Sequence, residues 1–489
     1  MTLDPTERLR AIHFELIKIT QAWALRRAPD LARAAQLRRR AALLLHAHYL
    51  ETIPAYGRLA RQEGIDRLDQ GEMEPAIETI KRHLMLPDDL FKSYDQKWLD
   101  EKAFGRMNTW LAEIFHQPVE VDVADVRTID EWIDRLGEAG IRLVYSSGTS
   151  GNFSFVPRDP ASWRRFRLAS ACTLTPLVSA KVGSAWQRRL LGPACRLLPP
   201  DLFARLTQGI GVKDYDAFFL DFQHGHTGNQ TLVQELAPLF RRHFALYETD
   251  LSPTVLRLLA RGPRTDEDRQ QLAQLQHVVA DQRDENYQRL AGRIRESTNA
   301  GQKIFIFGTT HQYKEFCDDL AARGEQLDPR PGSLLLFGGG WKSFSGVRIA
   351  RDQLLDLMST HLGVPLDRIL EGYSMTEINA FMLRCDHGQF HIPPTLEPIL
   401  FDEELSPIAG PFLAPETGTP AATGARHGIL GFLDPFATAY PGFLVSGDEV
   451  RMVDGDCDCG LSGPAVTDIS RAGVREMKGC GGIMASLAT

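Results

Sequence analysis

The segment Tyr145-Ser146-Ser147-Gly148-Thr149-Ser150-Gly151 follows directly after the apolar run Ile141-Arg142-Leu143-Val144. This order predicts a strand that ends in a hydroxyl-rich loop. Two glycines leave the backbone unobstructed, so backbone N–H groups can converge with Ser and Thr hydroxyls on phosphate oxygens. The loop differs from the P-loop of kinases and GTPases, because no Gly-Lys-Ser/Thr follows it. Taken alone, it is either a phosphate site or an ordinary surface loop.

Two motifs further along the chain favour the phosphate site. They are Gly372-Tyr373-Ser374-Met375-Thr376-Glu377 and Val445-Ser446-Gly447-Asp448. Together with the loop, and in this order, they resemble the motifs of the adenylate-forming enzymes, which include acyl-CoA synthetases, peptide-synthetase adenylation domains and luciferases. Each motif is weak alone, whereas three in register across the chain are specific.

Three other segments resemble two particular groups within that superfamily. Leu84–Lys92 resembles an N-terminal Pro-x-x-x-Phe-Lys segment, and Gly338–Lys342 resembles a Gly-Gly-Trp-Lys stretch of acyl-protein synthetases of the bacterial luminescence type. Cys457–Gly460 is similar to a Cys-x-Cys-Gly near the end of phenylacetate-CoA ligases. The resemblance covers roughly residues 50 to 470. It implies an α/β fold of the adenylate-forming large-domain type.

Composition excludes several classes of protein. With 489 residues and 43% hydrophobic content, the chain can bury a large core. Its net charge of -8 gives no indication of a nucleic-acid partner. No stretch approaches the ~20 apolar residues that span a bilayer, and the N-terminus lacks the apolar centre of a signal peptide. Seven cysteines at uneven spacing indicate no disulfide framework, so we expect a cytoplasmic protein.

The periodicity of apolar residues divides the chain into regions. Residues 1–117 are predicted to be helical, because Leu, Ile and Ala recur at three- and four-residue spacing. Residues 118–470 are predicted to form an α/β core with much parallel sheet, because short apolar strands alternate with helical segments. The clearest of these are strands at 144–145, 303–307 and 334–337, and helices at 163–170 and 352–361.

The C-terminal part is predicted to be less regular. Residues 404–448 are rich in Pro, Gly and Thr, which indicates loops and short strands. Adenylate-forming enzymes usually continue beyond the position of Asp448 with a small mobile domain, whose lysine reaches the reacting carboxylate. Here the chain ends at Thr489, so we expect a minimal, truncated lobe and a short tail at 471–489. The acyl-protein synthetases are similarly short at this end.

The resemblance implies a role for each motif in joining a carboxylate to ATP. Two anions must meet, so the site has to neutralise charge and fix their geometry. The loop at 146–151 would hold the β- and γ-phosphates, and Thr376 would donate to the α-phosphate. Glu377 would bind Mg²⁺, which prefers carboxylate and phosphate oxygens. Asp448 would accept hydrogen bonds from both ribose hydroxyls.

Other residues would complete the nucleotide site. Tyr373 offers a ring on which adenine can stack, and Arg471 would contact the ribose. Gly338, Gly339 and Gly340 would let the backbone approach the base. Arg158 would replace the lysine that usually follows the phosphate loop. For 373–377, the structural alternative is a helix N-terminus capped by Thr376.

A second group of residues has the chemistry of a metal site. Cys385, His391, Cys457 and Cys459 provide three thiols and an imidazole, which favour four-coordinate structural Zn²⁺. The resemblance also implies a zinc site between these two loops. His387 competes with His391 as the fourth ligand, and buried free thiols are the alternative to zinc.

Three further residue groups have open interpretations. Cys480 lies between glycines near the C-terminus, where the acyl-protein synthetases carry the cysteine that accepts the acyl group; an incidental cysteine is the alternative. His311 follows a predicted strand and either faces the reacting carboxylate or gates the acyl pocket; a core or rim histidine is the alternative. His224 and His226 are expected in a surface loop rather than in a metal site.

The sequence therefore predicts an ATP- and Mg²⁺-dependent enzyme that adenylates a small-molecule carboxylic acid. It would then pass the acyl group to a thiol of its own, of an acceptor protein or of coenzyme A. The alternatives are an enzyme that forms an amide or activates another oxyanion, and a catalytically inactive nucleotide-binding scaffold.

Overall fold

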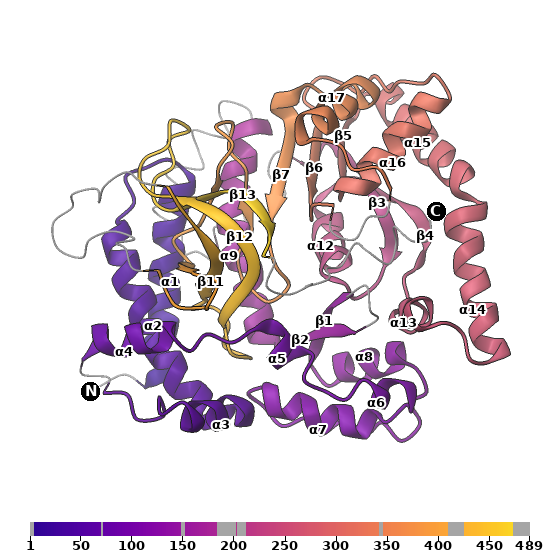
Figure 1. The fold of residues 1–489 in the computed structure, drawn as a ribbon. Helices are drawn as coiled ribbons and strands as arrows, with labels where there is room; N and C mark the ends of the chain where they lie inside the picture. The colour runs from indigo at the N-terminus through magenta and orange to yellow at the C-terminus, as the bar shows by residue number, and fades with distance from the viewer. Residues whose placement is uncertain are drawn as a thin grey trace.

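The computed structural model describes residues 4–69, 72–147, 152–182, 202, 212–341, 346–408 and 425–472, and it has a mixed α/β fold (Figure 1). Cys480, the glycine-containing segment 148–151 and most of the predicted tail lie outside the described residues. The predicted truncated lobe therefore stays a prediction. In the part that is described, no helix has the length and apolar character that crossing a membrane requires.

The N-terminal region is helical, as predicted, because apolar residues at helical spacing face a common core. Proline occupies the first turn of α1, α3 and α5, where its missing N–H costs nothing. In Figure 1, α1 and α2 lie beside the sheet that contains β11, β12 and β13. The helices of this region are α1 (Pro5–Ala24), α2 (Leu31–Thr52), α3 (Pro54–Gln62), α4 (Met73–Lys81), α5 (Pro87–Phe91), α6 (Lys97–Asp100) and α7 (Phe104–Ile114), and α8 (Ile129–Glu138) follows beyond residue 117.

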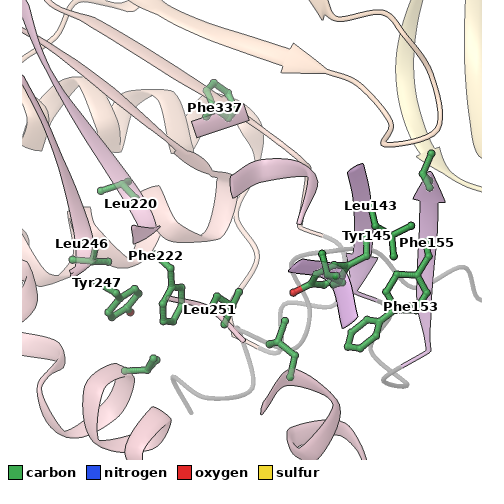
Figure 2. Close-up of a cluster of buried hydrophobic side chains, with 14 of the residues drawn as sticks. Leu143, Tyr145, Phe153, Phe155, Leu220, Phe222, Leu246, Tyr247, Leu251 and Phe337 are labelled. Carbon is green, nitrogen blue, oxygen red and sulfur yellow. The ribbon is translucent and has the colours of Figure 1, made fainter. Parts of the chain in front are cut away.

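The strands on either side of residues 148–151 form a hairpin. The predicted strand is confirmed as β1 (Arg142–Ser147), and the chain returns as β2 (Phe153–Arg158), which pairs antiparallel with it. Its aromatic side chains point into the same core as residues from β3 and β4 (Figure 2). Since every residue of β2 is buried, the hairpin is anchored along its length. The helix α9 (Pro160–Val182) follows it.

The central sheet is mostly parallel, which confirms the predicted α/β core. Among the described residues its order is β4-β3-β5-β6-β7-β8, with only β8 antiparallel. The carboxyl ends of β5, β6 and β7 lie side by side, so Thr309 pairs with Gly338 and Gly338 with Gly372. Its strands are β3 (Tyr215–His224), β4 (Arg242–Asp250), β5 (Lys303–Thr309), β6 (Leu334–Gly338), β7 (Ile369–Tyr373) and β8 (Met382–Leu383).

Helices connect and cover these strands, as expected for parallel crossovers. They are α12 (Gly228–Leu236), α13 (Pro253–Arg261), α14 (Asp266–Gln276), α15 (Arg283–Asn299), α16 (Thr310–Ala322) and α17 (Arg351–Leu362), with short helical turns η1 (Ala237–Leu239), η2 (His277–Asp281) and η3 (Leu366–Arg368).

The second sheet corrects the prediction that residues 404–448 contain only loops and short strands. Its order is β10-β11-β12-β13-β9 in the described part, and β11 and β12 are 8 and 11 residues long. The glycines that suggested loops allow close packing instead: a Cβ on Gly431 would lie 2.5 Å from the Phe401 ring. The strands are β9 (Phe390–His391), β10 (Glu397–Phe401), β11 (Arg426–Leu433), β12 (Phe443–Val453) and β13 (Ala465–Arg471).

The N-terminal helices hold the segment 434–442, which joins β11 to β12 and which we call the 434–442 loop. His13 on α1 is buried, stacks on Phe436 at 4.4 Å and donates from Nε2 to the Pro435 carbonyl at 2.6 Å. Burial lowers the pKa of His13 to about 3. Since the unfolded chain binds a proton on this ring near pH 6.5, the folded state favours the neutral ring.

This pKa shift predicts an acid-dependent loss of stability. The contribution of His13 is fully present above pH ~6.5 and is lost as the pH falls toward the pKa of the folded state. A His13→Gln variant keeps a donor for Pro435 but does not titrate. We expect its free energy of unfolding to fall less steeply between pH 6.5 and 4, by up to about 1.4 kcal/mol per pH unit. Chemical denaturation at a series of pH values measures this slope. The same substitution at the exposed His427 is the control, and equal slopes for wild type and His13→Gln would contradict the prediction.

Candidate active site and metal centre

The hairpin contacts the segment that follows β7. Ser146 on β1 is paired with Ser154 on β2, and the Ser154 hydroxyl donates to Glu377 Oε1 at 3.2 Å. Glu377 is 7% exposed, so its carboxylate lies at the inner edge of the site. The contact brings the phosphate-loop hairpin to the second motif.

The second motif begins at the carboxyl end of a parallel strand, where ligands bind in open α/β sheets. β7 ends at Tyr373, and the residues after it form turns, so the alternative of a helix N-terminus capped by Thr376 is wrong. The Thr376 hydroxyl lies against the start of α12, because a Cβ added to Gly228 would be 2.9 Å from its Oγ1.

The third motif is bound to the same segment. Asp448 on β12 is 8% exposed and accepts a hydrogen bond from Tyr373 Oη at 2.8 Å. Arg471, its register partner on β13, forms an ion pair with the other carboxylate oxygen at 3.0 Å. Burial and the nearby Asp448 carboxylate raise the pKa of Tyr373 well above its usual value, so its hydroxyl remains a donor.

The three motifs thus meet at one segment: Glu377 contacts the hairpin and Tyr373 contacts Asp448. The Tyr373 hydroxyl donates to the carboxylate of Asp448, which was predicted to bind the ribose. This hydrogen bond orders Asp448 before any nucleotide binds. The functions of these residues toward ATP remain predictions, as do those of Ser147 and Gly148–Gly151.

The glycines at the carboxyl end of β6 lie beside this segment. A Cβ on Gly338 would lie 2.5 Å from the Gly372 carbonyl oxygen, so the close approach of two strands requires this glycine. Gly339 and Gly340 have φ values of 83° and 58°, which glycine adopts without strain. His311 lies close by in the first turn of α16. It is 4% exposed, and its Nδ1 is 3.1 Å from the Thr309 hydroxyl.

Arg158 has a different role from the one predicted. It pairs with Arg142 at the end of the hairpin opposite the Ser147–Phe153 pair, and it is 2% exposed. Its guanidinium donates to the Asn379 side chain and, at 3.0 Å, to the Thr376 carbonyl. Because the buried guanidinium of Arg158 donates to these two groups, we interpret Arg158 as a residue that fixes the 376–379 turn and not as a phosphate ligand.

The predicted metal ligands lie together. One ligand atom from each of Cys385, His391, Cys457 and Cys459 lies within 4.8 Å of the others, whereas His387 is exposed and is not part of this group. Cys459 Sγ is 3.3 Å from His391 Nε2, and the Sγ atoms of Cys385 and Cys457 are 3.9 Å apart. Three thiols and an imidazole at these distances fit a tetrahedral zinc ion.

The protonation state of the imidazole also suits a metal. Burial lowers the pKa of His391 to about 4, which leaves the neutral imidazole that binds metals. Burial and the adjacent thiols raise the pKa of Cys459 to about 12. Without a cation this thiol therefore keeps its proton, and a bound zinc ion would release the proton and stabilise the thiolate.

Two residues near the cluster were not anticipated from the sequence. Trp23 donates from its indole to the Ser462 carbonyl at 2.8 Å, and Arg26 Nε donates to the Cys459 carbonyl at 2.7 Å. They connect the end of α1 to the loop between β12 and β13. His224 is exposed but is the last residue of β3, so the expectation of a loop is wrong for it, whereas His226 is half-exposed in the connection that follows; both pair with acidic residues.

Comparison with known proteins agrees with these observations. Residues 277–489 match the model of the family described as acyl-protein synthetase, LuxE. A long-chain-fatty-acid–luciferin-component ligase of Aliivibrio fischeri is 29% identical over 161 residues, which are 31% of this chain and 37% of that protein. Its counterpart from Vibrio harveyi is 25% identical over 191 residues, 38% of this chain and 45% of that protein. The match therefore spans less than half the length of either curated relative.

Solved structures with a related arrangement include two CoA ligases. A 2-hydroxyisobutyryl-CoA ligase in an open conformation, in complex with 2-HIB-AMP and CoA, aligns with a TM-score of 0.44 and 12% identity, over 90% of this chain and 75% of that one. A long-chain-fatty-acid-CoA ligase from Archaeoglobus fulgidus aligns with a TM-score of 0.34 and 11% identity, over 72% and 57%. Through residues 277–489 the chain is related to the LuxE acyl-protein synthetases, which confirms the resemblance predicted from its motifs.

Proposed function

We propose that the chain is an ATP- and Mg²⁺-dependent ligase of the adenylate-forming type, which activates a carboxylic acid and transfers its acyl group to a thiol. One observation carries the proposal. The hairpin contacts Glu377 in the segment after β7, and Asp448 contacts Tyr373 at the end of that strand. The serines of the hairpin would bind the phosphates of one Mg·ATP, while the two nearly buried carboxylates would bind its metal ion and its ribose.

In the first step, a carboxylate oxygen of the acid attacks the α-phosphorus of ATP. The acyl–phosphate bond forms as the bond to pyrophosphate breaks, and pyrophosphate leaves. Glu377 would hold Mg²⁺ against the phosphates, and Thr376 would donate to an α-phosphate oxygen. Asp448 would accept from the two ribose hydroxyls, with Arg471 holding its orientation through their ion pair.

In the second step, a thiolate sulfur attacks the acyl carbonyl, a thioester forms and AMP leaves. The acceptor is Cys480, a cysteine of a partner protein or coenzyme A. His311, in the first turn of α16, contacts Thr309, which is the register partner of Gly338, and would border the acyl group. Because both curated relatives are named for long-chain fatty acids, we propose these as the first substrates to test.

We also propose that the cluster of Cys385, His391, Cys457 and Cys459 binds one structural zinc ion. It lies at the turn between β12 and β13, the strands that carry Asp448 and Arg471. A zinc ion there would fix the register of the two strands from their far end.

A pyrophosphate-exchange assay tests the proposed function. Purified protein is incubated with Mg·ATP, labelled pyrophosphate and a panel of long-chain fatty, aryl and amino acids. We expect label to enter ATP only when a suitable acid is present. Intact-protein mass spectrometry of wild type and Cys480→Ser then shows whether the chain itself gains the acyl mass. Absence of exchange with every acid would contradict the proposal.

A further inference from the structure

The 434–442 loop is unusual for a connection between two strands, because all nine of its residues are buried. Loops normally run over the surface, since buried backbone groups need partners. Here those partners are found on both sides. One side of the loop faces the segment that carries Glu377, and the other faces the N-terminal helices.

The inner side of the loop binds the backbone around Glu377 directly. Tyr440 Oη donates to the Glu377 carbonyl at 2.9 Å. Asp434 accepts from the backbone N–H of Asn379 at 2.6 Å and from its side-chain amide at 2.9 Å. Arg158 donates to the oxygen of the same amide, so Asn379 has a fixed orientation. The turn at 377–379 is therefore bound at both ends by side chains that do not belong to the three motifs.

The outer side of the loop is held by the helical region. Tyr49 on α2 donates to the Ala437 carbonyl and accepts from the backbone N–H of Gly442 at 3.2 Å. Further contacts come from His13 to Pro435, from His48 to Thr438 and from the backbone N–H of His116 to Ala439. The loop is thus a rigid link between the N-terminal helices and the Glu377 turn.

We propose that Tyr440 and Asp434 are positioning residues for Glu377, and that through it they set the affinity of the site for Mg²⁺. The proposal rests on the proposed function, in which Glu377 is the protein's ligand for this ion. Mg²⁺ demands near-ideal octahedral geometry at about 2.0–2.1 Å. A functional group has to be held within about 0.5 Å of its productive position. A displaced Glu377 should weaken the use of Mg²⁺ and leave binding of the acid unchanged.

Substitution of Tyr440 by phenylalanine tests this proposal. The variant removes one hydroxyl and leaves the Glu377 carbonyl without its donor. We expect the Mg²⁺ concentration that gives half-maximal pyrophosphate exchange to rise about tenfold. We expect the half-saturating concentration of the acid to stay unchanged. A merely structural role for Tyr440 would lower the amount of folded protein without shifting the Mg²⁺ titration.

Two more variants complete the experiment. Asp434→Asn perturbs the other end of the turn and is expected to shift the Mg²⁺ titration in the same direction, so the test does not depend on Tyr440→Phe alone. Tyr215→Phe is the matched control: Tyr215 is equally buried and donates to a backbone carbonyl, that of Gly332, but it lies at the amino end of β3. It is expected to leave the titration unchanged.

The outcomes separate this inference from the proposed function. An unchanged Mg²⁺ titration in folded Tyr440→Phe and Asp434→Asn, with active wild type, would overturn the positioning role alone. The same shift in Tyr215→Phe would also overturn it, because the effect would then be general. Wild type without acid-dependent exchange would overturn the proposed function and this inference with it.

Discussion

Replacing Asp448 by alanine is expected to lower acid-dependent pyrophosphate exchange at least about 100-fold. The carboxylate would bind two ribose hydroxyls, and hydrogen bonds to a charged group contribute about 1.5–3 kcal/mol each. Loss of both corresponds to roughly 10²–10⁴ in the catalytic efficiency for ATP. The variant also leaves Tyr373 and Arg471 without their shared partner, which adds disorder at the same place. Exchange kinetics with varied Mg·ATP measure the effect.

The control for this variant comes from the same part of the sheet. Asp454 follows β12 and forms an ion pair with Arg426 at 3.0 Å, much as Asp448 does with Arg471. Asp454→Ala should leave the exchange rate near that of wild type. Glu377→Gln, which removes the charge that Mg²⁺ requires, should be as inactive as Asp448→Ala. If both of these site variants retained wild-type exchange, the assignment of the motifs would be refuted.

Substituting Cys457 by serine is expected to remove zinc from the protein. Wild type purified without chelator should contain one zinc per chain, and the variant should contain almost none, since serine is a poor ligand for this ion. Because metal binding is coupled to folding, the free energy of unfolding should fall by several kcal/mol. Exchange activity should also fall, because the β12–β13 pair that carries Asp448 and Arg471 would lose its anchor. Metal analysis and thermal unfolding of the same samples check both results.

Another cysteine provides the control for the metal prediction. Cys317 on α16 is buried and burial raises the pKa of its thiol, but it is not part of the cluster. Cys317→Ala should keep the full zinc content, whatever its effect on stability. Wild type that binds no zinc, even when refolded in its presence, would favour the alternative of buried free thiols.

Local patterns were sufficient to predict much of the fold. Helices such as α17 and strands such as β5 were predicted because the spacing of their apolar residues reflects which side is buried. The parallel sheet followed from the alternation of such elements. The second sheet was missed because Gly428 and Gly431 have the composition of loops. These glycines are needed because Phe401 on β10 packs closely against both of them. Local composition does not reveal such a contact between distant strands.

The candidate site was likewise predicted only in part. The three motifs and the four metal ligands were found because the chemistry of each requires certain residue types at certain spacings. Arg158 was misassigned, since its neighbours Thr376 and Asn379 are more than 200 residues away in sequence. Tyr440 and Asp434 were missed for the same reason. They act through the backbone of Glu377, and no spacing rule describes such a contact.

The proposed function requires that three distant parts of the chain jointly hold one nucleotide. A crystal structure with Mg²⁺ and a non-hydrolysable ATP analogue tests this most directly. We predict the triphosphate at the 146–151 loop, the metal ion on Glu377 and the ribose hydroxyls on Asp448. A nucleotide bound elsewhere, or bound without contact to either carboxylate, would contradict the account.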